Sequence, residues 1–315
     1  MTAQITIAHL YPEVMNTYGD RGNIAAIVRR CGWRGITADV QELRIGDPMP
    51  SRPADLIVIG NGGESGQALI AGDLVTVKGP AIAEAVARGS AALAVGGGFE
   101  LFGRFCRRAS GSDLPGIGLF DSWTIRPGAD LKSELRTIAE ARADRAIGDL
   151  VVRWGSEILV GFENHGGRTH LGPAARPLGS VLVGHGNNGD GHEGVQLGNA
   201  IGTYLRGPCL PRNPALADFL IRAAVTVRHG DVDLLALPDD LERAAHDVAV
   251  SRVLAAQPER RALGGRLRFG WRPARRQGSA SSGSASSGAA GPGAVGSGAA
   301  GSGRAGASGA VADAG

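Results

Sequence analysis

The stretch Ala91-Ala-Leu-Ala-Val-Gly-Gly-Gly98 decides the fold of this 315-residue chain. Its five apolar residues are typical of a strand that is buried on both faces, and its three glycines predict a tight turn. We expect a helix over Phe99–Arg107 after this turn. The stretch Asp55-Leu-Ile-Val-Ile-Gly60, followed by Asn61-Gly62-Gly63, repeats the strand and the glycine turn. Strands that alternate with helices indicate a mainly parallel sheet with helices on both faces.

The same alternation extends over residues 1–230, which we interpret as one α/β domain. The hydrophobic content of the chain, 43%, is enough for a sizeable core. Further strands are expected at Ile5–Leu10, Ile36–Leu43, Leu119–Ile125, Leu150–Trp154, Ile158–Phe162 and Ser180–Val183, and further helices at Gly22–Cys31, Pro80–Arg88 and Pro214–Val227.

The C-terminal part of the chain divides into a helical extension, 231–265, and a tail, 266–315. Asp239–Leu254 has the spacing of an amphipathic helix, which either packs on its own domain or docks a partner. The tail begins with a basic segment around Trp271 that is either solvated or in contact with anionic lipid or a partner. From about Gly278 it consists mainly of Gly, Ala and Ser. Such a segment buries too little apolar surface to offset the entropy of ordering, so we expect disorder.

Composition excludes several classes of function. The net charge is only +3 and aromatic residues make up 4% of the chain, which argues against a nucleic-acid-binding surface. The three cysteines are far apart and form no CxxC pair, so we expect no zinc site, no other metal and no disulfide scaffold. We expect no secretory signal, because no basic segment followed by a long apolar run begins the sequence, and no apolar run of about 18 residues is present. We therefore expect a cytoplasmic protein without a transmembrane segment.

The two glycine clusters are the expected location of any chemistry, because ligands bind beyond the carboxyl ends of parallel strands. A strand, a glycine turn and a helix can form a phosphate cradle, a nucleophile elbow or merely a tight turn. The phosphate interpretation is weak, since neither GxxxxGK[ST] nor a GxGxxG after the first strand is present.

Four motifs carry a resemblance to a known family: His9–Ile24, Gly161–Gly172, Gly184–Gly194 and Gly202–Ile221. In this order they resemble the glutaminase subunits of lipid II isoglutaminyl synthases, a cobyric-acid-synthase-like branch of the class I glutamine amidotransferases. The resemblance runs from about residue 6 to residue 229 and implies a flavodoxin-like α/β fold. It also implies a heterodimer with a Mur-ligase-like subunit, near the inner face of the membrane. The cofactors ATP and Mg²⁺ would bind that partner and none would bind this chain.

The resemblance implies a chemistry in which a Cys thiolate attacks glutamine, a His acts as the base, and backbone N–H groups stabilise the oxyanion. The ammonia would serve the partner in amidating the D-glutamate of the lipid II stem peptide. At the nucleophile position, where the family has Val-Cys-Gly-Gly, this chain has Gly96. At the base position it has Arg206, in Gly-Thr-Tyr-Leu-Arg-Gly-Pro, and a protonated arginine cannot accept a proton. The loop Gly60–Gln67 has also lost an arginine and an acidic residue of the family pattern.

We therefore predict a catalytically inactive copy that stabilises or regulates the ligase subunit. Gly96→Cys together with Arg206→His would be the minimum change to restore hydrolysis. The resemblance further implies that Arg145 binds glutamine and that the N–H groups of Gly62 and Gly97 are the oxyanion donors. Asp20, His165 and Arg168 also match family positions.

Two alternatives remain. Cys209 could replace the lost nucleophile in an active enzyme, since it lies three residues after Arg206. The chain could instead be a binding module in which Arg206 and Arg145 hold a carboxylate or an amino acid. Cys31 and Cys106 are expected in the core, Cys106 on the helix that we predict over Phe99–Arg107.

Overall fold

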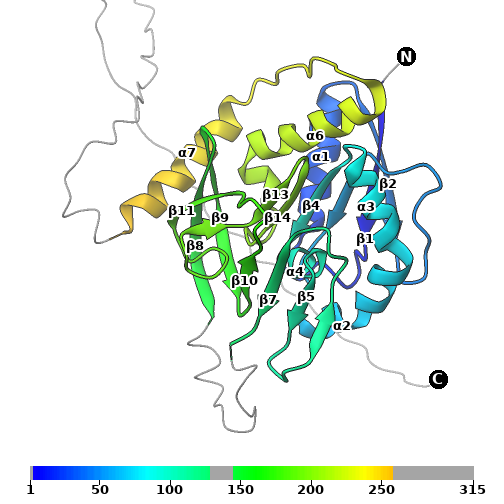
Figure 1. The fold of residues 1–315 in the computed structure, drawn as a ribbon. Helices are drawn as coiled ribbons and strands as arrows, with labels where there is room; N and C mark the ends of the chain where they lie inside the picture. The colour runs from blue at the N-terminus through cyan, green and yellow to red at the C-terminus, as the bar shows by residue number, and fades with distance from the viewer. Residues whose placement is uncertain (1–2, 128–144, 258–315) are drawn as a thin grey trace, which may run out of the picture. The chain divides into compact units, whose positions relative to one another are not determined.

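A computed structural model of the chain describes residues 3–127 and 145–257. Its centre is a six-stranded sheet in the order β13-β14-β4-β3-β1-β2 (Figure 1). All neighbouring strands are parallel except β13, which is antiparallel to β14 at one edge. The mainly parallel sheet predicted from the sequence is therefore confirmed. The strands are β1 (Gln4–Leu10), β2 (Thr37–Leu43), β3 (Leu56–Ile59), β4 (Ala91–Val95), β13 (Val195–Leu197) and β14 (Ala200–Thr203).

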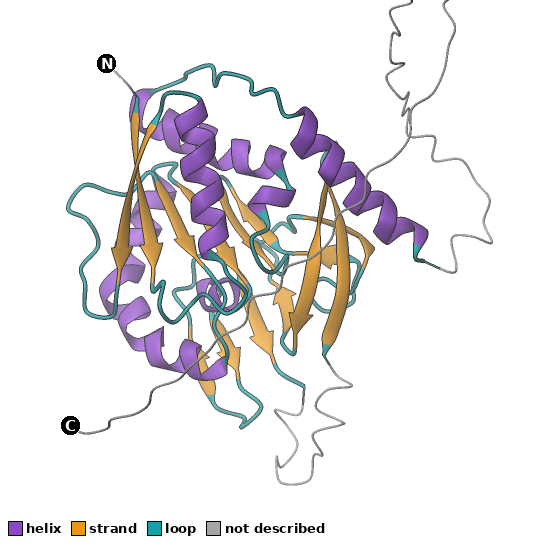
Figure 2. Cartoon of the chain, turned by 180° about the vertical axis from the view of Figure 1, so that it is seen from behind, coloured by secondary structure: helices purple, strands orange, loops and turns teal. Residues whose placement is uncertain are grey.

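Helices cover this sheet on both faces. On one face, α1 (Arg21–Trp33) and α6 (Pro214–His229) pack against each other, as Figure 2 shows. On the other face lie α2 (Glu64–Asp73) and α3 (Gly79–Ala87), joined by the π-helical segment Leu74–Lys78. Strands β3 and β4 are buried along their whole length, which explains why apolar runs without alternation form strands here.

Two four-stranded sheets complete the fold beside the central one. The first has the order β10-β7-β5-β6 and the second the order β12-β11-β8-β9. Their strands are β5 (Phe105–Arg107), β6 (Asp113–Pro115), β7 (Ser122–Ile125), β8 (Ala146–Trp154), β9 (Glu157–His165), β10 (Arg168–Leu171), β11 (Gly179–Val183) and β12 (His192–Glu193).

The prediction of a helix over Phe99–Arg107 is wrong for the second half of this range. Helix α4 spans only Gly97–Phe102, and the chain then turns into β5, which carries the buried Cys106. Gly103 makes this turn beside the start of β7, since a Cβ added to it would lie 2.8 Å from the carbonyl oxygen of Ser122. Apolar spacing alone did not separate one helical turn from a short paired strand.

Helix α7 (Asp240–Ala255) packs on this chain. Its buried residues Val250 and Val253 join Val151, Val160 and Val183 of the β8–β9–β11 sheet in a small apolar cluster. On its outer side, Leu241 and Val248 are exposed. The end of the predicted extension and the whole predicted tail lie outside the described residues. Within the described part of the chain, no helix is both long enough and apolar enough to cross a membrane.

The buried Arg30 of α1 holds the C-terminal helices to the core. Its guanidinium donates to both carboxylate oxygens of Asp218 on α6, at 2.7 and 2.8 Å, and to both oxygens of Asp239, at 2.9 and 2.6 Å. Asp239 is the residue that precedes α7, so one guanidinium joins three helices.

We predict that Arg30→Met lowers the free energy of unfolding by about 3–5 kcal/mol, because it leaves the buried Asp239 carboxylate without its partner. Urea denaturation of the full chain measures this. The matched control is Arg29→Met on the exposed side of α1, which should change stability by less than about 0.5 kcal/mol. Equal effects of the two substitutions would contradict the role assigned to Arg30.

Candidate functional site

Gly96 forms the sharp turn between β4 and α4. Its backbone has φ 55° and ψ −112°, in the left-handed half of conformational space, and its N–H donates to the carbonyl of Thr203 at the end of β14. Glycine takes this conformation without the penalty that a Cβ brings. A strand, a turn residue of positive φ and a helix are the geometry of a nucleophile elbow, here without a side chain.

Arg206 lies directly over this turn. A Cβ built on Gly96 would be 2.5 Å from Nη1 and 2.8 Å from Cζ of Arg206. The arginine follows β14, and its backbone N–H donates to the carbonyl of Phe162 on β9 at 2.9 Å, which fixes its position between two sheets. The structure thus brings together the two residues at which the sequence indicated a lost nucleophile and a lost base.

The Arg206 side chain is buried, with 6% of its surface exposed. Among the described residues its Nε has no hydrogen-bond partner, and no ion pair within 4.0 Å joins it to a carboxylate. The rings of Tyr18 and Tyr204 lie 5.7 and 6.0 Å from its Cζ. Burial lowers the pKa of Arg206, while the charge of Glu100 opposes this shift. Arginine nevertheless remains protonated in proteins and cannot act as a base here.

Asn61 closes the turn from the side of β3. Its Oδ1 accepts a hydrogen bond of 2.8 Å from the N–H of Gly97 and lies 2.5 Å from the Cβ position of Gly96. The Gly97 N–H is one of the two donors that we expected for an oxyanion, and Gly62, the other, lies beside it. The Gly97 N–H therefore already donates its hydrogen bond to the side-chain oxygen of Asn61. This role of Asn61 was not predicted from the sequence, although an asparagine within a glycine cluster is a signal for it.

A buried polar network lies behind the turn. Glu100 on α4 accepts hydrogen bonds from Gln67 at 2.5 Å, from Arg126 at 2.8 Å and from Tyr204 at 3.1 Å. Burial raises the pKa of Glu100, but the Arg126 charge and the Gln67 hydrogen bond outweigh it and hold that pKa below its usual value. Glu100 is thus an ionised carboxylate paired with Arg126, and it leaves Arg206 without a direct partner.

Arg145 is connected to Arg206 by a chain of contacts through two other residues, Asn164 and Tyr18. Its guanidinium donates to Oδ1 of Asn164 on β9 at 2.7 Å, and Asn164 donates to the hydroxyl of Tyr18 at 2.9 Å. Because the Tyr18 ring also lies against Arg206, the contacts run continuously from Arg145 to Arg206. Whether Arg145 binds glutamine stays a prediction.

The other residues that match the family motifs make contacts within the fold. Asp20 accepts from the backbone N–H of Asn61 at 3.1 Å, and burial raises its pKa to about 6. His165 stacks on Tyr204 with ring centroids 3.7 Å apart, and its Nδ1 bonds the Gly167 carbonyl. Arg168 starts β10 and donates to the same carbonyl at 3.3 Å. These contacts hold the loops around the turn.

The structure argues against Cys209 as a replacement nucleophile. Cys209 is completely buried, and burial together with the nearby Asp20 charge raises the pKa of its thiol. A nucleophilic cysteine needs the opposite shift. In residues 3–127 and 145–257, no cluster of His, Cys, Asp and Glu side chains could hold a metal ion.

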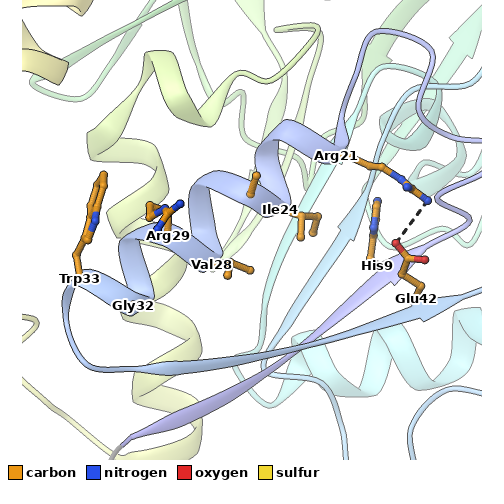
Figure 3. Close-up of a pocket in the computed structure, with 9 residues that line it drawn as sticks. His9, Arg21, Ile24, Val28, Arg29, Gly32, Trp33 and Glu42 are labelled. Atoms are coloured by element: carbon orange, nitrogen blue, oxygen red, sulfur yellow. Dashed lines mark ion pairs between the residues drawn. The ribbon is translucent and has the colours of Figure 1, made fainter.

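A pocket of about 810 Å³ lies beside α1 and contains none of the residues around Gly96 (Figure 3). An exposed ion pair of 3.5 Å between Arg21 and Glu42 lies next to His9 at one end, and Trp33 lies at the other. Burial lowers the pKa of His9, which favours the neutral imidazole. We assign no chemistry to this pocket.

The CobB/CobQ-like glutamine amidotransferase domain model matches residues 6–214. The chain belongs to this family. It is 32% identical over 251 residues to the lipid II isoglutaminyl synthase (glutamine-hydrolyzing) subunit GatD of Staphylococcus aureus strain N315, an alignment that covers 79% of this chain and 96% of that protein. It is 34% identical to the subunit GatD of Streptococcus pneumoniae R6, over 76% of this chain and 88% of that protein. A cobyric acid synthase of Pelotomaculum thermopropionicum is 31% identical over 135 residues, 40% of this chain and 25% of that enzyme.

The resemblance stated from the motifs is therefore confirmed, and with it the role of a glutamine amidotransferase-type subunit. In this member of the CobB/CobQ-like family, a glycine, a guanidinium and an amide meet at the turn after β4. None of these three groups can attack an amide carbon or accept a proton at neutral pH.

We predict that Gly96→Cys is destabilising for two separable reasons. A residue other than glycine at this φ costs about 1–3 kcal/mol, and its Cβ would also crowd Arg206 and Asn61. Adding Arg206→His should recover part of the loss, with a coupling of roughly 0.5–3 kcal/mol in a double-mutant cycle measured by urea unfolding.

Gly35→Cys is the matched control, because Gly35 has a similar φ of 69° but open space around its Cβ position. It should cost less than Gly96→Cys and show no coupling to Arg206→His. If Gly96→Cys and Gly35→Cys lower the free energy of unfolding equally and show the same coupling to Arg206→His, Arg206 and Asn61 do not crowd a side chain at position 96.

Proposed function

We propose that this chain is the glutaminase-type subunit of a lipid II isoglutaminyl synthase complex and that it does not itself hydrolyse glutamine. The observation that carries the proposal is the meeting of Gly96, Arg206 and Asn61 in a chain 32–34% identical to subunits GatD over nearly their whole length. Amide hydrolysis by this family's chemistry needs a thiolate, a base and free oxyanion donors. Gly96 and Arg206 stand at the positions of the thiolate and the base, and the Gly97 N–H donates to Asn61.

The partner is a Mur-ligase-like subunit in a heterodimer, and this chain stabilises or regulates it. The ligase would bind ATP and Mg²⁺ and amidate the D-glutamate of the lipid II stem peptide, with ammonia from outside this chain. Two features support the assignment. Four stretches that resemble family motifs lie between residues 9 and 221, and the fold around the elbow is closely packed. The complex would work in the cytoplasm at the inner face of the membrane, where lipid II is accessible.

We predict that the purified chain releases no ammonia from glutamine above background, alone or with the co-expressed ligase. Loss of a catalytic unit typically lowers kcat by a factor on the order of 10⁴–10⁶. A coupled ammonia assay tests this, with Cys209→Ala as the matched variant. Ammonia release that scales with the parent protein and disappears in Cys209→Ala would contradict the proposal and establish Cys209 as a nucleophile.

We also predict a 1:1 complex with the Mur-ligase-like subunit on co-expression, measured by size-exclusion chromatography with light scattering at micromolar concentration. A chain that ends at residue 277 should form the same complex, because the Gly, Ala and Ser beyond it offer few side chains for an interface. Separate elution of the two full-length proteins would contradict a role as a ligase subunit.

A further inference from the structure

The pocket beside α1 has a buried polar atom without a partner in its wall. His9 on β1 lines this pocket, only 1% of its surface is exposed, and its Nε2 has no hydrogen bond to the described residues. Most buried polar atoms in proteins are hydrogen-bonded, so this one needs an explanation, and a ligand atom in the pocket supplies it. The pocket volume of about 810 Å³ is also that of a small-molecule site, about 300–1,000 Å³.

The polar end of the pocket matches hydroxyl groups better than a single charge. Arg21 and Glu42 form an ion pair of 3.5 Å next to His9, so this end offers a donor and an acceptor together (Figure 3). A free anion would be repelled by Glu42 and a free cation by Arg21. Burial lowers the pKa of His9, so its ring is neutral at pH 7. A hydroxyl both donates and accepts, and it therefore pairs with Nε2 of the neutral ring in either tautomer.

The opposite end of the pocket presents an indole and a guanidinium to solvent. Trp33, the last residue of α1, is 51% exposed. Arg29 lies one helical turn earlier on the same side of α1, is exposed, and has no hydrogen bond or ion pair with another described residue. An indole face stacks on a planar ring, and a guanidinium binds a phosphate through parallel hydrogen bonds. This end is therefore suited to a planar ring with a phosphate beside it.

The order of these groups along α1 selects the class of ligand. Arg21 and Trp33 are separated by about 18 Å along the helix axis. Between them, the apolar side chains of Ile24 and Val28 line the pocket. The pocket thus offers, in sequence, a surface for a planar ring, a cation and a hydroxyl-binding end. A base, a diphosphate and a sugar follow one another in the same order in a nucleotide sugar.

We propose that the pocket beside α1 binds a nucleotide sugar. The base stacks on Trp33 and the diphosphate contacts Arg29. The sugar hydroxyls bind His9, Arg21 and Glu42. The inference concerns binding, and no reaction is assigned to the pocket. It does not rest on the proposed function, because neither the turn after β4 nor a ligase subunit contributes to this pocket.

Isothermal titration calorimetry on the full chain tests the proposal, with UDP-glucose, ADP-glucose, UDP and glucose 1-phosphate as probes. UDP-glucose and ADP-glucose should bind with similar affinity, because stacking on an indole tolerates any base. Both should bind at least about fivefold more tightly than UDP, which lacks the sugar, or glucose 1-phosphate, which lacks the base.

Substitutions at the two ends of the pocket should have different effects. Trp33→Ala and Arg29→Met should weaken UDP-glucose and UDP alike, Trp33→Ala by about tenfold. His9→Leu should weaken UDP-glucose about fivefold and leave the affinity for UDP unchanged. Glu42→Gln, an exposed position, should do the same without disturbing the interior. The matched control is Arg222→Met, an exposed arginine on α6, which should leave all affinities unchanged.

Thermal melting separates a ligand-binding role of His9 from a structural one. Without ligand, His9→Leu should melt no lower than the parent, because the imidazole Nε2 has no partner to lose. UDP-glucose should raise the Tm of the parent by more than that of His9→Leu.

The proposal is overturned if neither nucleotide sugar binds the parent at millimolar concentration, or if UDP binds as tightly as UDP-glucose, which would indicate an anion site only. It is also overturned if both His9→Leu and Glu42→Gln leave UDP-glucose binding unchanged, or if Arg222→Met weakens it as much as Arg29→Met does. The ligase complex and the ammonia assay use different readouts, so failure here leaves the proposed function standing.

Discussion

Position 96 accepts no side chain while Arg206 and Asn61 keep their places, and the chemistry of the site depends on this steric constraint. The Cβ position of Gly96 is 2.5 Å from an atom of each neighbour, so a nucleophile could enter only if both moved. The three residues belong to different strand ends, and the parallel sheet brings them to one edge. The missing side chain at position 96 leaves room for both neighbours, so the three residues are sterically linked.

Electrostatics distinguish Arg206 from the buried Arg30 and the half-buried Arg126. Arg30 binds two carboxylates and Arg126 binds Glu100, whereas the described structure offers Arg206 only two aromatic rings and distant charges. The first two arrangements stabilise the fold, because each charge is compensated where it is buried. Burial of the third is compensated only in part, by the charges of Glu100 and Asp20 and by contact with the two rings.

Much of this architecture could be predicted from the sequence. Strands β3 and β4 have unbroken apolar runs, and glycines mark the turns after them, so the central sheet and the place of the site followed from local patterns. Helix α4 was predicted too long, because the close approach of Gly103 to β7 is a tertiary effect that spacing does not contain. The role of Asn61 was missed for a related reason, since its hydrogen bond to Gly97 spans 36 positions of sequence.

The central claim is that Asn61 closes the site together with Gly96 and Arg206, and glutamine hydrolysis by reconstructed variants tests it most directly. The sequence indicated that Gly96→Cys with Arg206→His is the minimum change, whereas the structure adds Asn61→Gly, which frees an oxyanion donor. Ammonia release should therefore appear in the triple variant and be at least about tenfold slower in the double variant, since one oxyanion donor is worth that much or more. Equal rates in the two variants would contradict the account.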